Sequence, residues 1–283
     1  MQKMLRQGVL ALILSFSIWG CGDDGNESRI TGPDLEKGPG RVFPIKSVSF
    51  PSIDEVPVGA LFGQIEGSVQ PRPVVILVHD FFLDNNEWFQ TDFYVDLLER
   101  GYLPLAINLR GHGIPTQGNT PLPEGRTLLQ LEDLENMHRD VQAALTWLRT
   151  QPTADIDRVA VVGSGLGGNV AYVSMGVFPQ QIKAAVALSP GLWDNTLEPI
   201  VIGAGQVPFS PHSMLFLVGS DDITITPSGE ELNFPIFSNN LAAITANPKA
   251  LTELDGIAAH ASQLLLVPGV SDQIFSWLET HLQ

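Results

Sequence analysis

The sequence predicts an α/β protein with a mostly parallel central sheet of about eight strands and helices on both faces. Two observations predict it. From about residue 45 onward, short apolar segments typical of strands alternate with longer segments of helical periodicity. Several of the strand segments are apolar without a break, as expected of strands buried on both faces. The 283 residues, 44% of them hydrophobic, suffice for one large domain with a substantial core.

The elements are expected in the following order. Residues 46–50 and 58–67 are predicted to form an antiparallel pair of strands that opens the sheet. Further strands are predicted at 73–79, 102–109, 158–163, 182–190, 213–220 and 250–256. Helices are predicted at 87–101, 128–151, 168–177 and 270–282. Segments 191–212 and 228–249 are punctuated by Pro, Asn and Gly, and we expect them to be insertions at the edge where such sheets bind ligands.

The N-terminus has the pattern of an export signal. Two basic residues precede an apolar run that ends at Cys21 and is shorter than an ordinary membrane-spanning helix. The ending SIWGC resembles a bacterial lipoprotein signal, which implies cleavage before Cys21 and acylation of its thiol. The alternative is cleavage elsewhere, which would leave a free thiol. We expect a signal peptide at 1–20, a flexible tether at 21–44 and an α/β domain at 45–283.

The lipoprotein signal also implies a location. By resemblance to lipoproteins, acyl chains would hold the protein on a bacterial membrane. Gly22 stands where an Asp would signal retention in the inner membrane, so we expect the outer membrane, facing the periplasm or the cell surface.

Cysteine content and charge restrict disulfide bonds and partners. Cys21 is the single cysteine, so an internal disulfide is excluded. The net charge of −16 argues against a nucleic-acid partner.

The segment RVAVVGSGLGGNVAYV at 158–173 is typical of a strand, a tight glycine turn and a helix. Gly163, Gly165 and Gly168 match the G-x-G-x-x-G pattern of a dinucleotide site. That pattern expects an acidic residue about 20 positions later, which would hold the ribose. The first acid after the turn is Asp194, beyond the next strand. The dinucleotide interpretation is therefore disfavoured, and we expect no cofactor.

Five motifs resemble, in the same order, those of the α/β-hydrolase family, which includes esterases, lipases and dienelactone hydrolases. They are LVHDFF, INLRGHG, VAVVGSGLGG, FLVGSDDITITP and DGIAAH. The resemblance extends over about residues 45–283 and implies the α/β-hydrolase fold. Two departures occur within the motifs. Asp80 replaces the usual glycine of the first motif, and Asn108 replaces an Asp that is frequent in the second.

The resemblance also implies a catalytic triad in the order nucleophile, acid, histidine. Residue by residue, it assigns the acid to Asp222 and the histidine to His260, with Asp221 as the competing acid. The nucleophile position of the G-x-S-x-G elbow falls on Gly165, so the serine is missing there. The match to the dinucleotide pattern is a by-product of that replacement.

Two further features of the elbow follow from the same comparison. Ser164 precedes the nucleophile position, and bringing it to the tip would require a one-residue shift of a buried strand. The backbone N–H groups of Phe81 and Leu166 would form the oxyanion hole. A carboxylate at Asp80 beside that hole would repel a developing oxyanion unless it is paired or points away.

We therefore expect a lipid-anchored protein of this fold that is non-catalytic or weakly active and binds a small apolar or ester-like ligand, or a protein partner. The alternative is an active carboxylic ester hydrolase that uses Ser164 or another nucleophile with His260 and Asp222. No two histidines form a close ligand pair and no H-E-x-x-H pattern occurs, so we expect no metal site.

Overall fold

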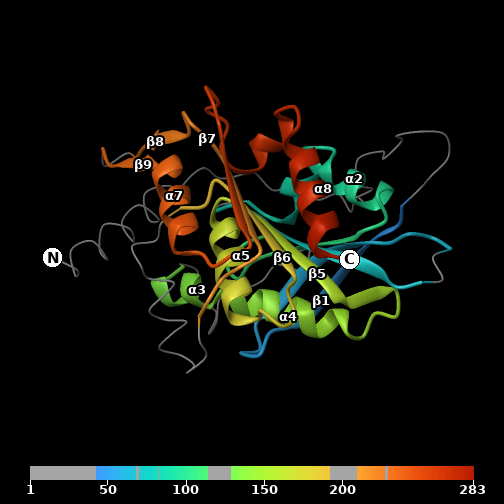
Figure 1. The fold of residues 1–283 in the computed structure, drawn as a ribbon. Helices are drawn as coiled ribbons and strands as arrows, with labels where there is room; N and C mark the ends of the chain where they lie inside the picture. The colour runs from blue at the N-terminus through green and yellow to red at the C-terminus, as the bar shows by residue number, and fades with distance from the viewer. Residues whose placement is uncertain (1–42, 68–69, 82, 114–128, 192–208, 227–228) are drawn as a thin grey trace, which may run out of the picture.

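A computed structural model describes residues 43–67, 70–81, 83–113, 129–191, 209–226 and 229–283 (Figure 1). Its main sheet has eight strands in the order β1-β2-β4-β3-β5-β6-β7-β10. The strands are β1 (Ile45–Pro51), β2 (Pro57–Gly63), β3 (Arg72–Val78), β4 (Leu103–Ile107), β5 (Ala154–Ser164), β6 (Ala184–Leu188), β7 (Met214–Gly219) and β10 (Lys249–Leu254). The predicted fold class is confirmed.

The sheet is antiparallel at one edge and parallel elsewhere. Strand β2 pairs antiparallel with both β1 and β4. All pairs from β4 to β10 are parallel. The antiparallel pair predicted at the start of the domain is therefore confirmed.

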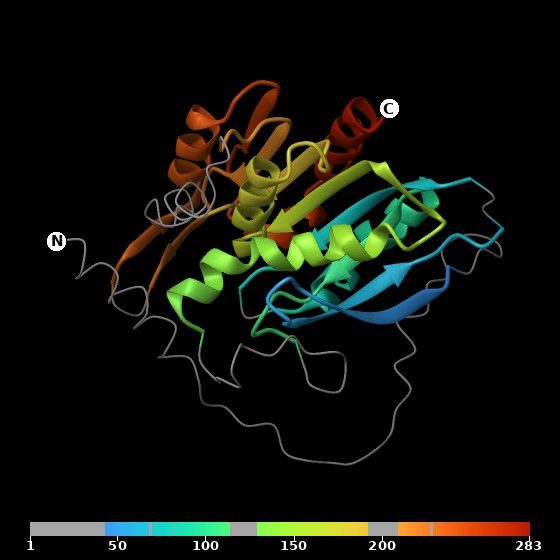
Figure 2. The ribbon, with the colours of Figure 1, turned by 90° about the horizontal axis from the view of Figure 1, so that it is seen from below.

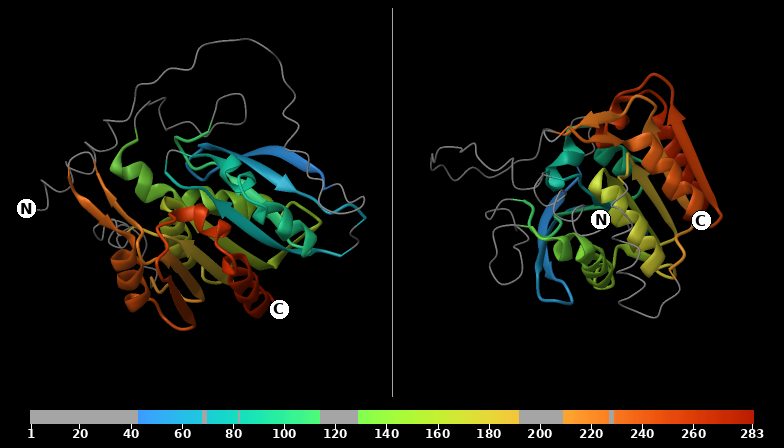
Figure 3. Two further views of the ribbon diagram at one scale, coloured as in Figure 1. Left: turned by 90° about the horizontal axis from the view of Figure 1, so that it is seen from above. Right: turned by 90° about the vertical axis from the view of Figure 1, so that its left-hand side faces the viewer.

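Helices cover both faces of the sheet. They are α2 (Phe93–Glu99), α3 (Leu131–Asn136), α4 (His138–Leu148), α5 (Leu166–Val177), α7 (Phe234–Ile244) and α8 (Val270–His281), with 3-10 helices η1 (Asn85–Phe89) and η4 (Ala261–Leu266). Figure 2 shows α4 and α5 in front of one face, and the left view of Figure 3 shows α2 and α8 over the other.

The core is divided by the sheet into two layers. Val74, Ile76 and Val78 of β3 belong to the layer under α4 and α5, whereas Val75 and Leu77 belong to the layer under α2 and α8. All five side chains are fully buried. Burial on both faces explains why this strand is apolar without a break.

Two predicted helices are each divided in the structure. The segment predicted at 87–101 contains η1 and α2, and the segment predicted at 128–151 contains α3 and α4 with Met137 between them. The apolar spacing was therefore informative about which residues are buried, but not about the breaks.

Segment 228–249, predicted as an insertion after a strand, contains regular elements that the sequence analysis did not predict. It contains β9 (Glu231–Asn233), which pairs with β8 (Ile223–Ile225), and it contains α7. The Asn233 side chain accepts a hydrogen bond from the Ile236 N–H, and Pro235 lies in the first turn of α7. Asn and Pro thus start a helix here, as they commonly do, rather than interrupt one.

The turn after β4 is held by buried polar contacts. The Arg110 guanidinium is 2.7 Å from Asp140 and 2.7 Å from Asp54, and the Arg110 side chain is only 1% exposed. The Asn108 side chain accepts a hydrogen bond from the Asn85 N–H at 2.7 Å. The INLRGHG motif therefore connects the end of β4 to α4 through an ion pair and to η1 through a hydrogen bond.

The predicted signal peptide, nearly all of the predicted tether and most of segment 191–212 lie outside the described residues. Within the part of the chain that the structure describes, no helix has the length and apolar character needed to cross a bilayer.

Candidate active site

The candidate site lies where four parallel strands end. The residues concerned are Asp80 after β3, Gly165 after β5, Asp222 after β7 and His260 after β10. The carboxyl ends of parallel strands meet at one edge of a sheet, where this class of fold binds ligands. Segments that are far apart in the sequence are thereby brought together.

The elbow has the backbone geometry of a strained turn from strand to helix. Gly165 connects β5 directly to α5 with φ of 50° and ψ of −114°, a combination that residues with side chains rarely adopt. A Cβ atom on Gly163 would overlap the backbone of Gly167, and one on Gly167 would overlap the backbone of Val78. These two glycines therefore allow α5 to approach β3 and β5 closely.

Gly168 is not under the same constraint. A Cβ atom there would make an ordinary contact of 3.4 Å with Ala187. In a dinucleotide site the third glycine of G-x-G-x-x-G permits close packing of helix on strand, and that need is not present here. The geometry at Gly168 agrees with the interpretation of this turn as an elbow.

The structure brings His260 and Asp222 together. Both carboxylate oxygens of Asp222 are 3.0 Å from Nδ1 of His260. Asp222 is buried, whereas the competing Asp221 is exposed and accepts a hydrogen bond from the Ser220 hydroxyl instead. The ring of Phe234 packs against the imidazole with 4.2 Å between ring centres. Nδ1 therefore faces the acid and Nε2 faces the elbow.

The two N–H groups expected to form the oxyanion hole also lie together, and both donate to one atom. Oδ1 of Asp80 accepts hydrogen bonds from the Phe81 N–H at 2.6 Å and the Leu166 N–H at 2.8 Å. Oδ2 of the same carboxylate is 3.5 Å from Nε2 of His260. Asp80 is thus paired, and it points into the hole rather than away from it.

The carboxylate of Asp80 also fills the space that a side chain at position 165 would need. A Cβ atom built on Gly165 would lie 2.7 Å from Oδ2 of Asp80, and closer still to Oδ1 and Cγ. Contacts below 3.0 Å are not tolerated without movement of one group. A side chain at position 165 and the observed position of Asp80 therefore exclude each other.

His260 is held as a cation between two carboxylates. Burial alone would lower the pKa of the imidazole, but the hydrogen bonds to Asp222 and Asp80 outweigh it and raise the pKa to about 9. A histidine that keeps its proton at neutral pH cannot accept another, so it is a poor general base in this state.

Ser164 is not brought to His260 by the structure. Its side chain is fully buried, and its hydroxyl donates to Oε1 of Glu87 at 2.6 Å. The same hydroxyl accepts from the Ser262 N–H at 2.8 Å. Ser164 therefore faces the interior below the elbow, as expected of the residue before the tip.

Glu87 is a residue of the site that the sequence analysis missed. Its Oε2 accepts a hydrogen bond from the Asp80 N–H at 2.8 Å, while its Oε1 contacts Ser164. Burial raises the pKa of this carboxyl, against the hydrogen bonds from Ser164 and Ser262. Glu87 therefore joins the loop after β3, the elbow and the loop that carries the histidine. It was predicted only as the start of an amphipathic helix, and no spacing in the sequence marks it.

His79 fixes the same loop from the other side. Its Nε2 accepts a hydrogen bond from the Leu109 N–H at 3.0 Å, and its Nδ1 donates to the Asp80 carbonyl at 2.7 Å. Burial lowers the pKa of His79 to about 3, helped by the charge of His112. A neutral imidazole is required for this pair of bonds, because one nitrogen must accept and the other donate.

A model of the alpha/beta hydrolase family matches residues 75–276. The chain belongs to this family. The match spans the loop after β3, the elbow, Asp222 and His260, so the motifs recognised in the sequence all lie within or at the border of the matched region.

One curated protein is similar to this family member over part of its sequence. A "serine hydrolase-like protein" of Danio rerio is 31% identical over 133 residues, which are 47% of this chain and 35% of that protein. The chain thus spans about a third of the length of that curated relative.

Solved structures of higher coverage show the fold. Dienelactone hydrolase from Anabaena variabilis is 17% identical with a TM-score of 0.62, covering 85% of this chain and 99% of that one. An esterase of Pyrococcus furiosus is 17% identical with a TM-score of 0.59, covering 85% and 94%. Acetyl xylan esterase from Paenibacillus sp. R4 is 18% identical with a TM-score of 0.59, covering 88% and 87%.

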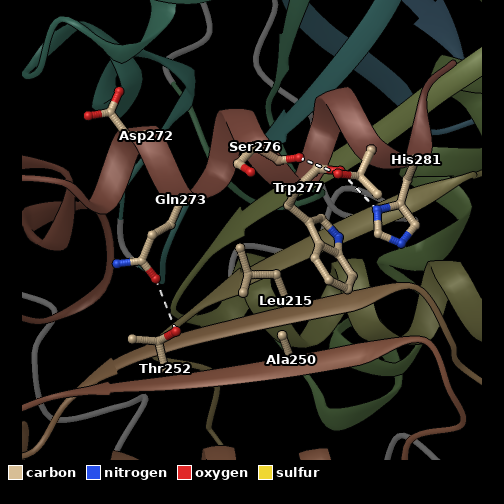
Figure 4. Close-up of a pocket in the computed structure, with 9 residues that line it drawn as sticks. Leu215, Ala250, Thr252, Asp272, Gln273, Ser276, Trp277 and His281 are labelled. Carbon is tan, nitrogen blue, oxygen red and sulfur yellow. Dashed lines mark hydrogen bonds between the residues drawn. The ribbon is translucent and has the colours of Figure 1, made fainter.

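A surface cavity of this alpha/beta hydrolase family member lies away from the candidate site. It has a volume of about 490 Å³ between α8 and strands β7 and β10 (Figure 4). Leu215, near the start of β7, contributes to its floor, whereas Asp222 lies beyond the other end of that strand. Among the described residues, no group of three or more His, Cys, Asp or Glu could hold a metal ion.

Proposed function

We propose that the chain is a lipid-anchored protein of the alpha/beta hydrolase family that does not carry out serine-type acyl transfer and instead binds a small ligand or a protein partner at its site. The observation that carries the proposal is the position of Asp80. Its carboxylate occupies the space of a nucleophile at Gly165 and accepts from both N–H groups of the oxyanion hole.

Serine-type acyl transfer requires a nucleophile, a free oxyanion hole and a general base, and this site is unfavourable for all three. Removing the nucleophile of a triad costs about 10⁶-fold in turnover. An occupied oxyanion hole cannot stabilise the oxyanion of a tetrahedral intermediate. The His260 pKa of about 9 leaves the imidazole protonated at neutral pH. We therefore expect no efficient ester hydrolysis.

Slow hydrolysis by water is a second candidate, because the contact between His260 and Asp222 is intact. Hydrolysis through Ser164 is disfavoured, since its hydroxyl would have to leave Glu87 and the Ser262 N–H to reach the tip. Both routes would depend on His260.

The test is the hydrolysis of a short-chain p-nitrophenyl ester by the full mature protein in detergent, beside His260→Ala. We expect the two proteins to be indistinguishable from each other and from buffer. Turnover by the natural protein that disappears in His260→Ala would overturn the proposal and establish an active hydrolase.

A further inference from the structure

The surroundings of the Asp80 carboxylate form a complete carboxylate-binding site. Two backbone N–H groups, from Phe81 and Leu166, donate to one oxygen, and the His260 imidazole lies 3.5 Å from the other. The donors come from three separate segments of the chain. Hydrogen bonds to an ionised acceptor are stronger than those between neutral groups.

We propose that Phe81, Leu166 and His260 form a binding site for monocarboxylates that Asp80 occupies, so that Asp80 determines which ligands enter. The proposal rests on the proposed function in one respect, namely that this site binds a ligand and performs no acyl transfer. While Asp80 is in place, the site excludes carboxylates and acyl groups. When the side chain at position 80 is removed, an external carboxylate takes its position.

In the intact protein, both charge and hydrogen bonding support the exclusion of external carboxylates from this site. Two carboxylates, of Asp80 and Asp222, flank the single imidazole, so an entering anion meets a net negative site. The two N–H groups of the oxyanion hole already donate to Asp80. A carboxylate would have to displace Asp80 before it found a donor there.

The donors are expected to stay in place when the Asp80 side chain is removed. The Asp80 N–H donates to Glu87 and the Asp80 carbonyl accepts from His79, at 2.8 and 2.7 Å. These bonds involve only the backbone of residue 80 and do not depend on its side chain. Glycine is also the usual residue at this position of the motif, so Asp80→Gly leaves the loop with a suitable residue.

The matched control is Asp80→Asn. Its amide oxygen can still accept from both N–H groups, so the hole stays filled although the negative charge is gone. Asp80→Gly removes both the charge and the acceptor. Comparison of the two variants separates occupation of the hole from simple repulsion.

The experiment adds butyrate to the full mature protein in detergent and follows the ring resonances of His260 by NMR at about pH 6, where histidine is largely protonated. We expect saturable shifts in Asp80→Gly, with affinity at least about tenfold higher than in the natural protein or in Asp80→Asn. The pKa of His260 should fall in both variants, and butyrate should raise it again only in Asp80→Gly. His260→Gln combined with Asp80→Gly should weaken binding, as monitored by ligand-observed NMR.

Each other outcome counts against the inference. Equal butyrate affinity in the natural protein and Asp80→Gly would show that Asp80 does not control entry. Binding by Asp80→Asn as tight as by Asp80→Gly would show that charge, not occupation, is decisive. A folded Asp80→Gly protein that does not bind butyrate would remove the site altogether. Ester turnover by the natural protein is a separate readout, and it would overturn the proposed function instead.

Discussion

At the scale of single residues, Gly165 and Asp80 are coupled, because a side chain at one position and the observed side chain at the other exclude each other. Gly165→Ser alone should therefore remain inactive, since its side chain and the Asp80 carboxylate compete for the same space beside the oxyanion hole and His260. The double variant with Asp80→Gly should hydrolyse a p-nitrophenyl ester at least about 100-fold faster than Gly165→Ser, because a free hole is needed as well as a nucleophile. Asp80→Gly alone is the control and should stay inactive. Equal rates for the single and double serine variants would disprove the coupling.

The charge of His260 predicts a dependence of stability on pH. Its pKa of about 9 in the folded protein lies above the ordinary 6.5, so its ion pairs stabilise the fold fully below about pH 6.5. This contribution should be lost as the pH rises through about 9, when the imidazole loses its proton. The side chain is 30% exposed, which reduces the effect through solvent screening. The difference in Tm between the natural protein and His260→Gln should shrink over this range, and a constant difference would contradict the assignment.

Glu87 offers a third prediction at this scale. Glu87→Gln replaces one of the two acceptor oxygens with an NH2 group. Either the Asp80 N–H or the buried Ser164 hydroxyl then loses the acceptor of its hydrogen bond. We expect a loss of about 1–3 kcal/mol in the free energy of unfolding, measured by urea titration. The exposed Glu66→Gln is the control and should change it by less than about 0.5 kcal/mol. Similar values for both variants would show that Glu87 does not connect the loops.

At the scale of elements, the elbow depends on close contact between α5 and the sheet. A Cβ atom on Gly163 would overlap the Gly167 backbone, which cannot yield as a flexible side chain can. Gly163→Ala should therefore destabilise the protein by about 1–3 kcal/mol in urea unfolding. Gly168→Ala, in the first turn of α5, is the control, because its Cβ would find ordinary contacts. Equal destabilisation by the two variants would show that the overlap with the Gly167 backbone is not the cause of the loss.

The sequence was sufficient for the strands of the main sheet and insufficient for α7. Strands such as β3 are buried on both faces, so their apolar runs are unmistakable. Helix α7 begins with Asn233 and Pro235, which indicate a loop as readily as a helix start. The place of Gly165 at the turn from β5 to α5 could also be predicted, because it needs only a motif and its spacing. The position of the Asp80 side chain was not, since a carboxylate next to an oxyanion hole can point in or out. Only the fold shows that it points in, and only the fold shows that Glu87 lies beneath it.

At the scale of the whole molecule, the N-terminal segment predicts where the domain acts. We propose that Cys21 carries acyl chains that hold the protein on a membrane, because the residues before it resemble a lipoprotein signal. Two or more chains anchor a protein firmly, whereas an unmodified polar tether does not. In a bacterium with two membranes, the natural protein should take up a labelled fatty acid and sediment with the outer membrane. Cys21→Ser should take up no label and leave the membrane fraction.

The control for this prediction changes the destination and not the anchor. Gly22→Asp introduces the acid expected of inner-membrane retention, so this variant should take up label as the natural protein does and sediment with the inner membrane instead. Membrane-bound Cys21→Ser protein without label would show that another segment anchors the chain. If Gly22→Asp stayed with the outer membrane, the anchor would hold but the expected basis of its sorting would not. If Cys21 is the anchor, we propose that residues 21–44 form the tether between the membrane and the domain that carries the site, since about 20 residues of flexible chain span a few nanometres.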